Sequence, residues 1–217
     1  MSPTHLTAPR PIFPFALIPA AGRSRRMRSP KLLLDVNGKT VIARVLTALG
    51  EAGLANRLVV LQPQDELLKK EVELYGGRAL LPPTPPPEMR DSIQFGFKCV
   101  ADEILASGEP ADLHQPWLLV PADHPVIDAQ TVTILLEAAA KNPGRIVVPT
   151  HRGRRGHPTV FAWKHALQID QIPVGLGFNW IVEQLPADII EIEFASSGVL
   201  VDLDTPEDYE RLRKMWK

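Results

Sequence analysis

The chain has 217 residues, of which 45% are hydrophobic and 23% are charged, as is typical of one globular domain with a sizeable core. Its formal net charge of −1 argues against nucleic acid or an anionic membrane as a partner. The single cysteine, Cys99, excludes an internal disulfide. No apolar stretch reaches the roughly 18 residues that span a bilayer. Because Pro14 and Pro19 interrupt the apolar run 12–21, we do not interpret it as a signal peptide, and we expect a cytoplasmic protein.

Apolar runs alternate with helical patterns along most of the chain. Strands are predicted over residues 13–18, 58–61, 79–81, 117–120, 145–149, 159–162, 189–194 and 198–203. Helices are predicted from residue 41 to 50 or 53, and over 65–77, 92–105, 129–141, 179–184 and 206–216. Continuous apolar strands separated by amphipathic helices indicate an α/β fold, with a mostly parallel sheet and helices on both faces. We expect residues 1–10 to be a flexible tail and residues 11–217 to be one domain.

A small-residue and basic segment follows the first predicted strand. Residues 17–34 read LIPAAGRSRRMRSPKLLL, in which Ala20, Ala21 and Gly22 precede a run of arginines and Lys31. Small residues let the backbone approach a ligand closely, and turn amides beside Arg and Lys bind polyphosphate groups. The segment therefore predicts a nucleoside triphosphate site, although a lone basic surface loop would have the same composition.

Aspartates follow two other predicted strands. Asp123 comes directly after strand 117–120, and Asp202 and Asp204 flank Leu203 at the end of strand 198–203. Carboxylates at the carboxyl ends of strands face the ligand crevice, where Mg²⁺ takes one or two of them and completes its shell with water and phosphate oxygens. We predict Asp123 and Asp202 as the magnesium ligands. Asp204 precedes Thr-Pro-Glu, a good helix start, so we expect it to be a helix cap or an outer neighbour.

Three further motifs are ambiguous from the residues alone. Ser92 lies near a predicted helix N-terminus, where it could contact a base or ribose or simply cap the helix. Gly156 and His157 end a basic loop over residues 151–155, which either clamps a second anionic substrate or is solvated. Asn37-Gly38 predicts a tight turn rather than part of a phosphate-binding loop, because the glycine that such a loop needs is Leu33 here.

Taken together, these segments resemble the molybdenum cofactor nucleotidyltransferase family, whose members have a single Rossmann-like nucleotidyltransferase domain. The family pattern A-A-G-x-S-x-R-M-G-x-x-K is met by Ala20, Ala21, Gly22, Ser24, Arg26, Met27 and Lys31. Its later segments resemble residues 122–125, 156–158 and 202–208. Arg28 stands where the family usually has glycine, and residues 173–178 depart from the usual acidic, glycine-rich segment. The Ala20-Ala21-Gly22 form is similar to the cytidylyltransferase branch.

The resemblance implies a role for each matching position. The nucleotide would be bound by Ala20, Ala21, Gly22, Arg23, Ser24, Arg26, Lys31 and Ser92. Asp123 and Asp202 would hold magnesium, Arg26, Lys31 and Asp123 would act in catalysis, and Gly156 and His157 would bind the acceptor.

The leading hypothesis is transfer of a nucleoside monophosphate, with CTP favoured, to a phosphate-bearing acceptor, the molybdenum-pterin cofactor, with release of pyrophosphate. A molybdoenzyme would then be a possible partner. One alternative keeps this chemistry but changes the acceptor to a sugar phosphate or another small phosphate. The other alternative is a carrier that holds the nucleotide or pterin without catalysis.

Overall fold

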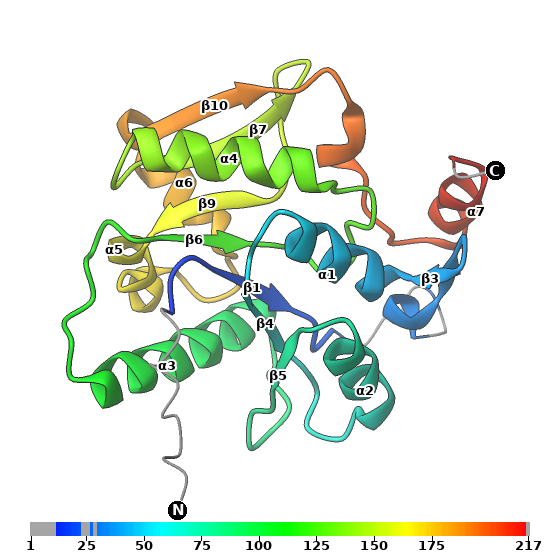
Figure 1. The fold of residues 1–217 in the computed structure, drawn as a ribbon, viewed down its shortest axis with the longest axis horizontal. Helices are drawn as coiled ribbons and strands as arrows, with labels where there is room; N and C mark the ends of the chain where they lie inside the picture. Colours follow the sequence, from blue (N-terminus) through cyan, green and yellow to red (C-terminus); the bar gives the residue numbers. More distant parts are fainter. Residues whose placement is uncertain (1–11, 23–26, 28–29, 216–217) are drawn as a thin grey trace, which may run out of the picture.

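Strand β1 (Phe15–Pro19) lies inside an eight-stranded sheet in the computed structural model, which describes residues 12–22, 27 and 30–215 (Figure 1). The strand order is β10 (Ile189–Glu193), β7 (Ile146–His151), β9 (Thr159–Ala162), β6 (Pro116–Leu119), β1, β4 (Asn56–Val60) and β5 (Arg78–Leu80). The eighth strand, β8 (Arg154–Arg155), pairs with β7. Neighbours are parallel except where β9 and β8 run antiparallel to their partners. The predicted mostly parallel sheet is confirmed.

Helices cover both faces of this sheet, as expected from strands that are buried on both sides. Alternate residues of β1 point to opposite faces, so Ala16 and Ile18 join one hydrophobic cluster while Phe15 and Leu17 join the other. The first cluster packs under α1 (Val41–Glu51), α2 (Glu66–Leu74) and α4 (Ala129–Lys141). The second packs under α3 (Met89–Ser107), α5 (Trp163–Ala166) and α6 (Asn179–Gln184).

Local signals in the sequence set several element boundaries. Helix α1 begins after Thr40, whose hydroxyl accepts a hydrogen bond from the Ala43 amide at 3.2 Å. The predicted turn at Asn37-Gly38 is confirmed: both residues have positive φ, 52° and 79°, and they join β2 (Asp35–Val36) to β3 (Lys39–Thr40). The last helix, α7 (Pro206–Met215), agrees with its predicted start.

Two predictions for local structure are wrong. Residues 198–203 are not a strand, because residues 197–200 form a 3-10 turn in which the Ser196 hydroxyl accepts from the Gly198 amide at 3.1 Å. Residues 151–155 are not a plain loop, since β7 turns back into β8 through Arg152 and Gly153, both with positive φ. Helix α3 also begins three residues before its predicted start at residue 92.

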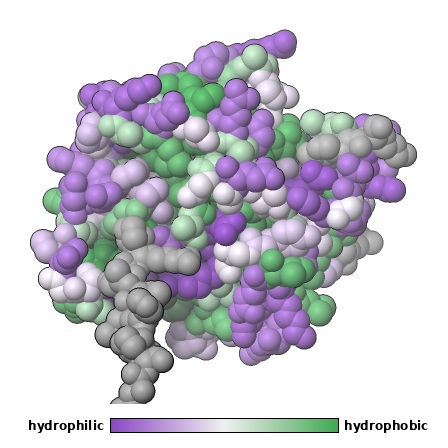
Figure 2. Space-filling view, viewed as in Figure 1, coloured by the Kyte–Doolittle hydropathy of each residue, from purple (hydrophilic) through white to green (hydrophobic). Residues whose placement is uncertain are grey.

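No described helix is both long and apolar enough to cross a membrane. Hydrophilic and hydrophobic side chains are interspersed over the face drawn in Figure 2. The predicted tail, residues 1–10, lies outside the described residues.

Candidate active site

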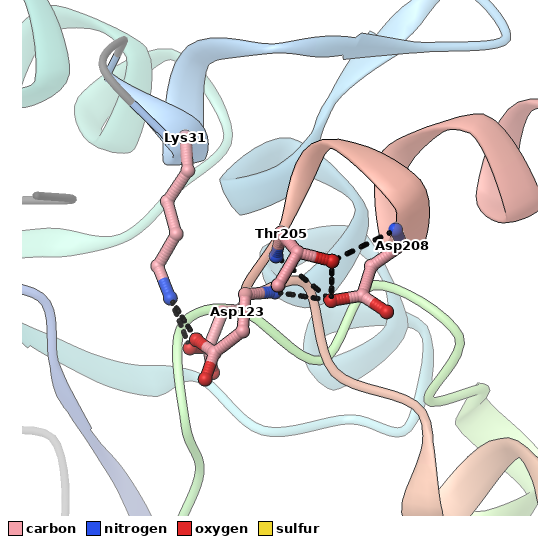
Figure 3. A network of polar contacts seen from close by, with 5 residues as sticks. Lys31, Asp123, Thr205 and Asp208 are labelled. Carbon is pink, nitrogen blue, oxygen red and sulfur yellow. Dashed lines mark hydrogen bonds and ion pairs between the residues drawn. The ribbon is translucent and has the colours of Figure 1, made fainter. Parts of the chain in front are cut away.

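Lys31 contacts two carboxylates that come from distant parts of the chain (Figure 3). Its ammonium nitrogen lies 2.6 Å from Asp123 Oδ2 and 3.0 Å from Asp204 Oδ1. Lys31 opens a 3-10 turn after the basic segment, Asp123 follows β6, and Asp204 precedes α7. Burial lowers the pKa of Lys31, but the two carboxylates outweigh this influence and raise the pKa above its ordinary value. The ammonium group therefore stays charged at neutral pH.

The backbone between Val201 and Asp204 places its acidic side chains beside Asp123. The Leu203 amide donates to the Asp123 carbonyl at 2.9 Å, and the Leu203 side chain is completely buried in the core. In an extended segment, residues on either side of a buried side chain point the other way, so Asp202 and Asp204 both point away from the core. Asp202 is exposed, and it is the Asp204 carboxylate that reaches Lys31.

The cap of α7 is made by a different aspartate from the one expected. Asp208 Oδ2 accepts hydrogen bonds from the Asp204 amide at 3.1 Å and from the Thr205 amide at 2.8 Å. The Thr205 hydroxyl in turn accepts from the Asp208 amide at 3.2 Å, which completes a reciprocal cap (Figure 3). With the helix start satisfied by Thr205 and Asp208, the Asp204 carboxylate is directed to Lys31 instead of capping the helix.

A cavity of about 530 Å³ opens beside Lys31 and Asp123. It lies outside the carboxyl ends of β1, β4 and β6, where open α/β sheets bind their ligands. Its lining includes five of the predicted nucleotide-binding residues, Ala20, Ala21, Gly22, Lys31 and Ser92. The other three, Arg23, Ser24 and Arg26, lie outside the described residues. The remaining lining residues are Pro19, Leu32, Gln62, Pro85, Pro86, Pro87, Glu88, Met89, Pro121, Ala122 and Asp123.

Ser92 lies in the first turn of α3 and is buried against this cavity rather than capping the helix. Only 3% of Ser92 is exposed. The helix start is closed by Asp91, whose carboxylate accepts from the Glu88 amide at 2.9 Å. The first turn of α3 therefore brings Ser92 to one wall of the cavity.

Two parts of the cavity wall were not predicted from the sequence. Gln62 follows β4 as directly as Asp123 follows β6, so the same strand-end argument would have found it. The proline segment 85–87 gave no chemical signal, because its residues line the cavity with apolar rings and backbone.

Gly156 and His157 pack directly behind the Asp123 turn. The His157 ring meets the His124 ring edge to face, with centroids 5.2 Å apart. A Cβ atom on Gly156 would lie 2.3 Å from the Val199 carbonyl oxygen, so only glycine allows this close approach. Burial lowers the pKa of His124, and it lowers the pKa of His157 to about 4, so both rings are neutral near pH 7. Their Nδ1 atoms are buried and have no hydrogen-bond partner among the described residues.

A second, smaller cavity of about 210 Å³ lies on the other side of His157, between β7, β9 and α6. Its polar lining comes from Arg155, His157, Thr159, Asn179 and Glu183. Hydroxyl, amide and charged groups in one small pocket suit a polar ligand or part of one. The Gly156-His157 segment therefore touches both this pocket and the turn that carries Asp123.

Comparisons with known proteins identify a family and a fold. The model of the family described as the MobA-like NTP transferase domain matches residues 16–186. A 2-C-methyl-D-erythritol 4-phosphate cytidylyltransferase of Pseudomonas aeruginosa is 32% identical over 148 residues. This match covers 66% of the chain and 60% of the relative, so the chain spans less than two thirds of the relative's length.

Two solved structures share the fold at low sequence identity. CMP:2-keto-3-deoxy-manno-octonic acid synthetase complexed with CTP is 19% identical, with a TM-score of 0.71 over 94% of this chain and 98% of that one. Rv0371c of Mycobacterium tuberculosis H37Rv, in complex with manganese, is 21% identical, with a TM-score of 0.68 over 93% of this chain and 98% of that one. These likenesses confirm the predicted fold class.

Proposed function

The chain belongs to the family of MobA-like NTP transferase domains, and on this premise we propose that it is a nucleotidyltransferase of the EC 2.7.7 type. The observation that carries the proposal is the contact of Lys31 with Asp123 and Asp204 at the edge of the cavity lined by Ala20, Ala21 and Gly22. Cationic and anionic groups meet there beside a backbone that a ligand can approach closely. This arrangement suits a metal-chelated triphosphate.

The reaction transfers a nucleoside monophosphate by in-line substitution at phosphorus. An oxygen of the acceptor phosphate forms a bond to the α-phosphorus of the nucleotide. The bond from that phosphorus to the oxygen bridging to the β-phosphorus breaks, and its electron pair leaves with pyrophosphate. A phosphate monoester is already anionic near neutral pH, so the enzyme needs no protein nucleophile or general base. Its task is positioning and charge neutralisation.

Lys31 supplies the positive charge that this chemistry needs. Its raised pKa keeps the ammonium protonated, so it offsets the negative charge that builds up on the leaving pyrophosphate. Arg26 is proposed for the same task and lies outside the described residues. Ser92, at the first turn of α3, is proposed to contact the nucleotide from the opposite wall of the cavity.

The donor set fits magnesium. Asp123 and Asp204 offer carboxylate oxygens, the hard ligands that Mg²⁺ prefers, and one or two protein carboxylates are enough when phosphates complete the shell. Asp202 is next to this pair and stays a candidate ligand. A bound Mg²⁺ would neutralise phosphate charge and align the α-phosphorus for attack. The manganese complex of Rv0371c supports a divalent cation at a site of this fold.

We favour CTP as the nucleotide and the molybdenum-pterin cofactor as the acceptor, with Gly156 and His157 on the acceptor side. The support is the order of the four motifs and the position of His157 between Asp123 and the smaller cavity. A sugar or polyol phosphate acceptor is the second candidate. It is supported by the similarity to the Pseudomonas relative, a 2-C-methyl-D-erythritol 4-phosphate cytidylyltransferase. The third candidate is a carrier that delivers the pterin or nucleotide to a molybdoenzyme.

One incubation series separates these candidates. The purified protein is mixed with CTP, GTP, UTP or ATP, with and without Mg²⁺, and with molybdopterin, a sugar phosphate or a polyol phosphate. Pyrophosphate is assayed and the products are identified by mass spectrometry. A Mg²⁺-dependent CMP adduct of one acceptor identifies that acceptor. Tight binding of a ligand without any adduct would favour the carrier.

Variants test whether the product arises at the candidate site. Asp123→Asn is expected to lose most turnover while it melts within a few degrees of the parent. Asp102→Asn, on the exposed surface of α3, makes the same chemical change away from the cavity and serves as the matched control. Equal activity of the two variants would show that the Asp123 carboxylate has no role in the reaction.

A further inference from the structure

Gln62 lines the larger cavity, two residues after the end of β4. Its side-chain amide nitrogen donates a hydrogen bond to the backbone carbonyl of Ala21, which lines the same cavity. This contact links the end of β4 to the segment that follows β1. Neither the motifs nor the charge pattern of the sequence assigns a role to Gln62.

The contact with Ala21 fixes the orientation of the Gln62 side-chain amide. A backbone carbonyl can only accept a hydrogen bond, so the NH₂ group of Gln62 must be the end that faces Ala21. The carbonyl oxygen of the side chain, Oε1, is thereby held in one orientation. No contact recorded among the described residues uses that oxygen, and the residue is partly exposed to the cavity.

The Ala21 carbonyl and Gln62 Oε1 are therefore two acceptor oxygens on hydrogen-bonded residues that line the same cavity. A carbonyl oxygen has two lone pairs, so the Ala21 oxygen retains accepting capacity after it binds Gln62. Adjacent acceptors match a ligand group that carries two hydrogens on one nitrogen. The exocyclic amino group of a nucleobase is such a group, whereas the equivalent position of uracil is a carbonyl that would face the protein acceptors.

We propose that Gln62 is a specificity-determining residue that selects nucleoside triphosphates whose base carries an exocyclic amino group, and so favours CTP over UTP. The proposal rests on the proposed nucleotide-binding function of this cavity. CTP forms a hydrogen bond from its 4-amino group to Gln62 Oε1. UTP places its O4 against that oxygen, and the two acceptors repel each other and stay unpaired.

The size of the effect follows from the cost of an unpaired polar group in a partly closed cavity. Wild-type protein is expected to bind CTP at least about tenfold more tightly than UTP, which corresponds to about 1.4 kcal/mol. The triphosphate of pyrimidin-2-one riboside, which has hydrogen in place of the 4-amino group, is expected to lose a similar factor. These ligands share the same sugar and phosphates, so their difference isolates the base.

The test is isothermal titration calorimetry of each ligand, with Mg²⁺ present, on the wild type, Gln62→Leu and Gln64→Leu. Gln64 is exposed two residues further on and does not line the cavity, so its variant is the matched control. Gln62→Leu is expected to reduce the preference for CTP over UTP to below about threefold, while Gln64→Leu keeps it. Gln62→Met, which has a similar length, replaces Gln62→Leu if the latter does not fold.

The outcomes distinguish a role of Gln62 in selecting the nucleobase from a purely structural role. If Gln62 only positions the Ala21 segment, its substitution weakens CTP, UTP and the analogue by the same factor, and the proposal is refuted. A wild type that binds CTP and UTP equally also overturns it. If the wild type binds no nucleoside triphosphate, the proposed function itself fails, which is a different result from a lost preference.

Discussion

Replacing Asp204 with asparagine removes one of the two carboxylates that contact Lys31. The variant keeps the size of the side chain, and Asp208 continues to cap α7. Asp202→Asn makes the same change two residues earlier, on an exposed side chain that faces the same side of the backbone. The pair of variants therefore compares Asp202, which the sequence pattern favoured as a metal ligand, with Asp204, which contacts Lys31 in the structure.

The structure sets different magnitudes for stability and for activity. The Asp204 side chain is 39% exposed, so its ion pair with Lys31 is screened by solvent and contributes less than about 1 kcal/mol to folding. Under the proposed function, the same carboxylate positions the Lys31 ammonium that would neutralise charge on the triphosphate. Losing one such group costs about a hundredfold in kcat/KM, or about 2.7 kcal/mol. Asp202→Asn is expected to cost less than about fivefold.

The assay measures initial rates of pyrophosphate release over a range of CTP and Mg²⁺ concentrations, together with urea unfolding of each variant. The expected result is a low kcat/KM for Asp204→Asn and near-normal unfolding for both variants. A hundredfold loss in Asp202→Asn with normal rates in Asp204→Asn would refute the reasoning, because it would show that proximity to Lys31 does not identify the functional carboxylate.

Three further outcomes follow from individual contacts. Lys31→Ala is expected to lower kcat/KM for CTP at least about a hundredfold while the protein stays folded. Pyrophosphate release measures the rate and thermal melting measures folding, and Lys141→Ala, on the exposed end of α4, is the control. Gly156→Ala is expected to lower the free energy of unfolding in urea by about 1–3 kcal/mol, because its Cβ would meet the Val199 carbonyl. Gly177→Ala, at an open position, is the control and is expected to stay within about 1 kcal/mol of the wild type. Equal values for the two variants would contradict the packing argument. Burial of His165 lowers its pKa from 6.5 to about 4, so the unfolded chain takes up a proton that the native chain does not as pH falls through 6.5. The contribution of neutral His165 to the free energy of unfolding is therefore fully present above pH 6.5 and is lost as the pH falls towards 4, by about 2 kcal/mol at pH 5. An unchanged pH dependence of unfolding in His165→Gln would disprove this expectation.

Much of the fold could be predicted from local signals in the sequence. The apolar runs that became β1, β4, β6 and β7 are buried on both faces of the sheet, and this burial leaves a direct pattern in the residues. The direction of β9 was not predicted. Only seven residues separate the end of β7 from Thr159, too few for the crossover that a parallel neighbour needs, so β9 runs antiparallel.

The candidate site, like the fold, was predicted only in part from the sequence. Local patterns in the chain predicted that the small-residue and basic segment and Asp123 follow buried strands, whose carboxyl ends meet at one edge of a parallel sheet. The contact of Asp204 rather than Asp202 with Lys31 depends on packing between distant residues, since burial of Leu203 and the Asp208 cap fix the backbone there. Likewise, only the packing of β4 against the Ala21 segment orients Gln62, because a hydrogen bond between residues 41 positions apart leaves no local pattern in the chain.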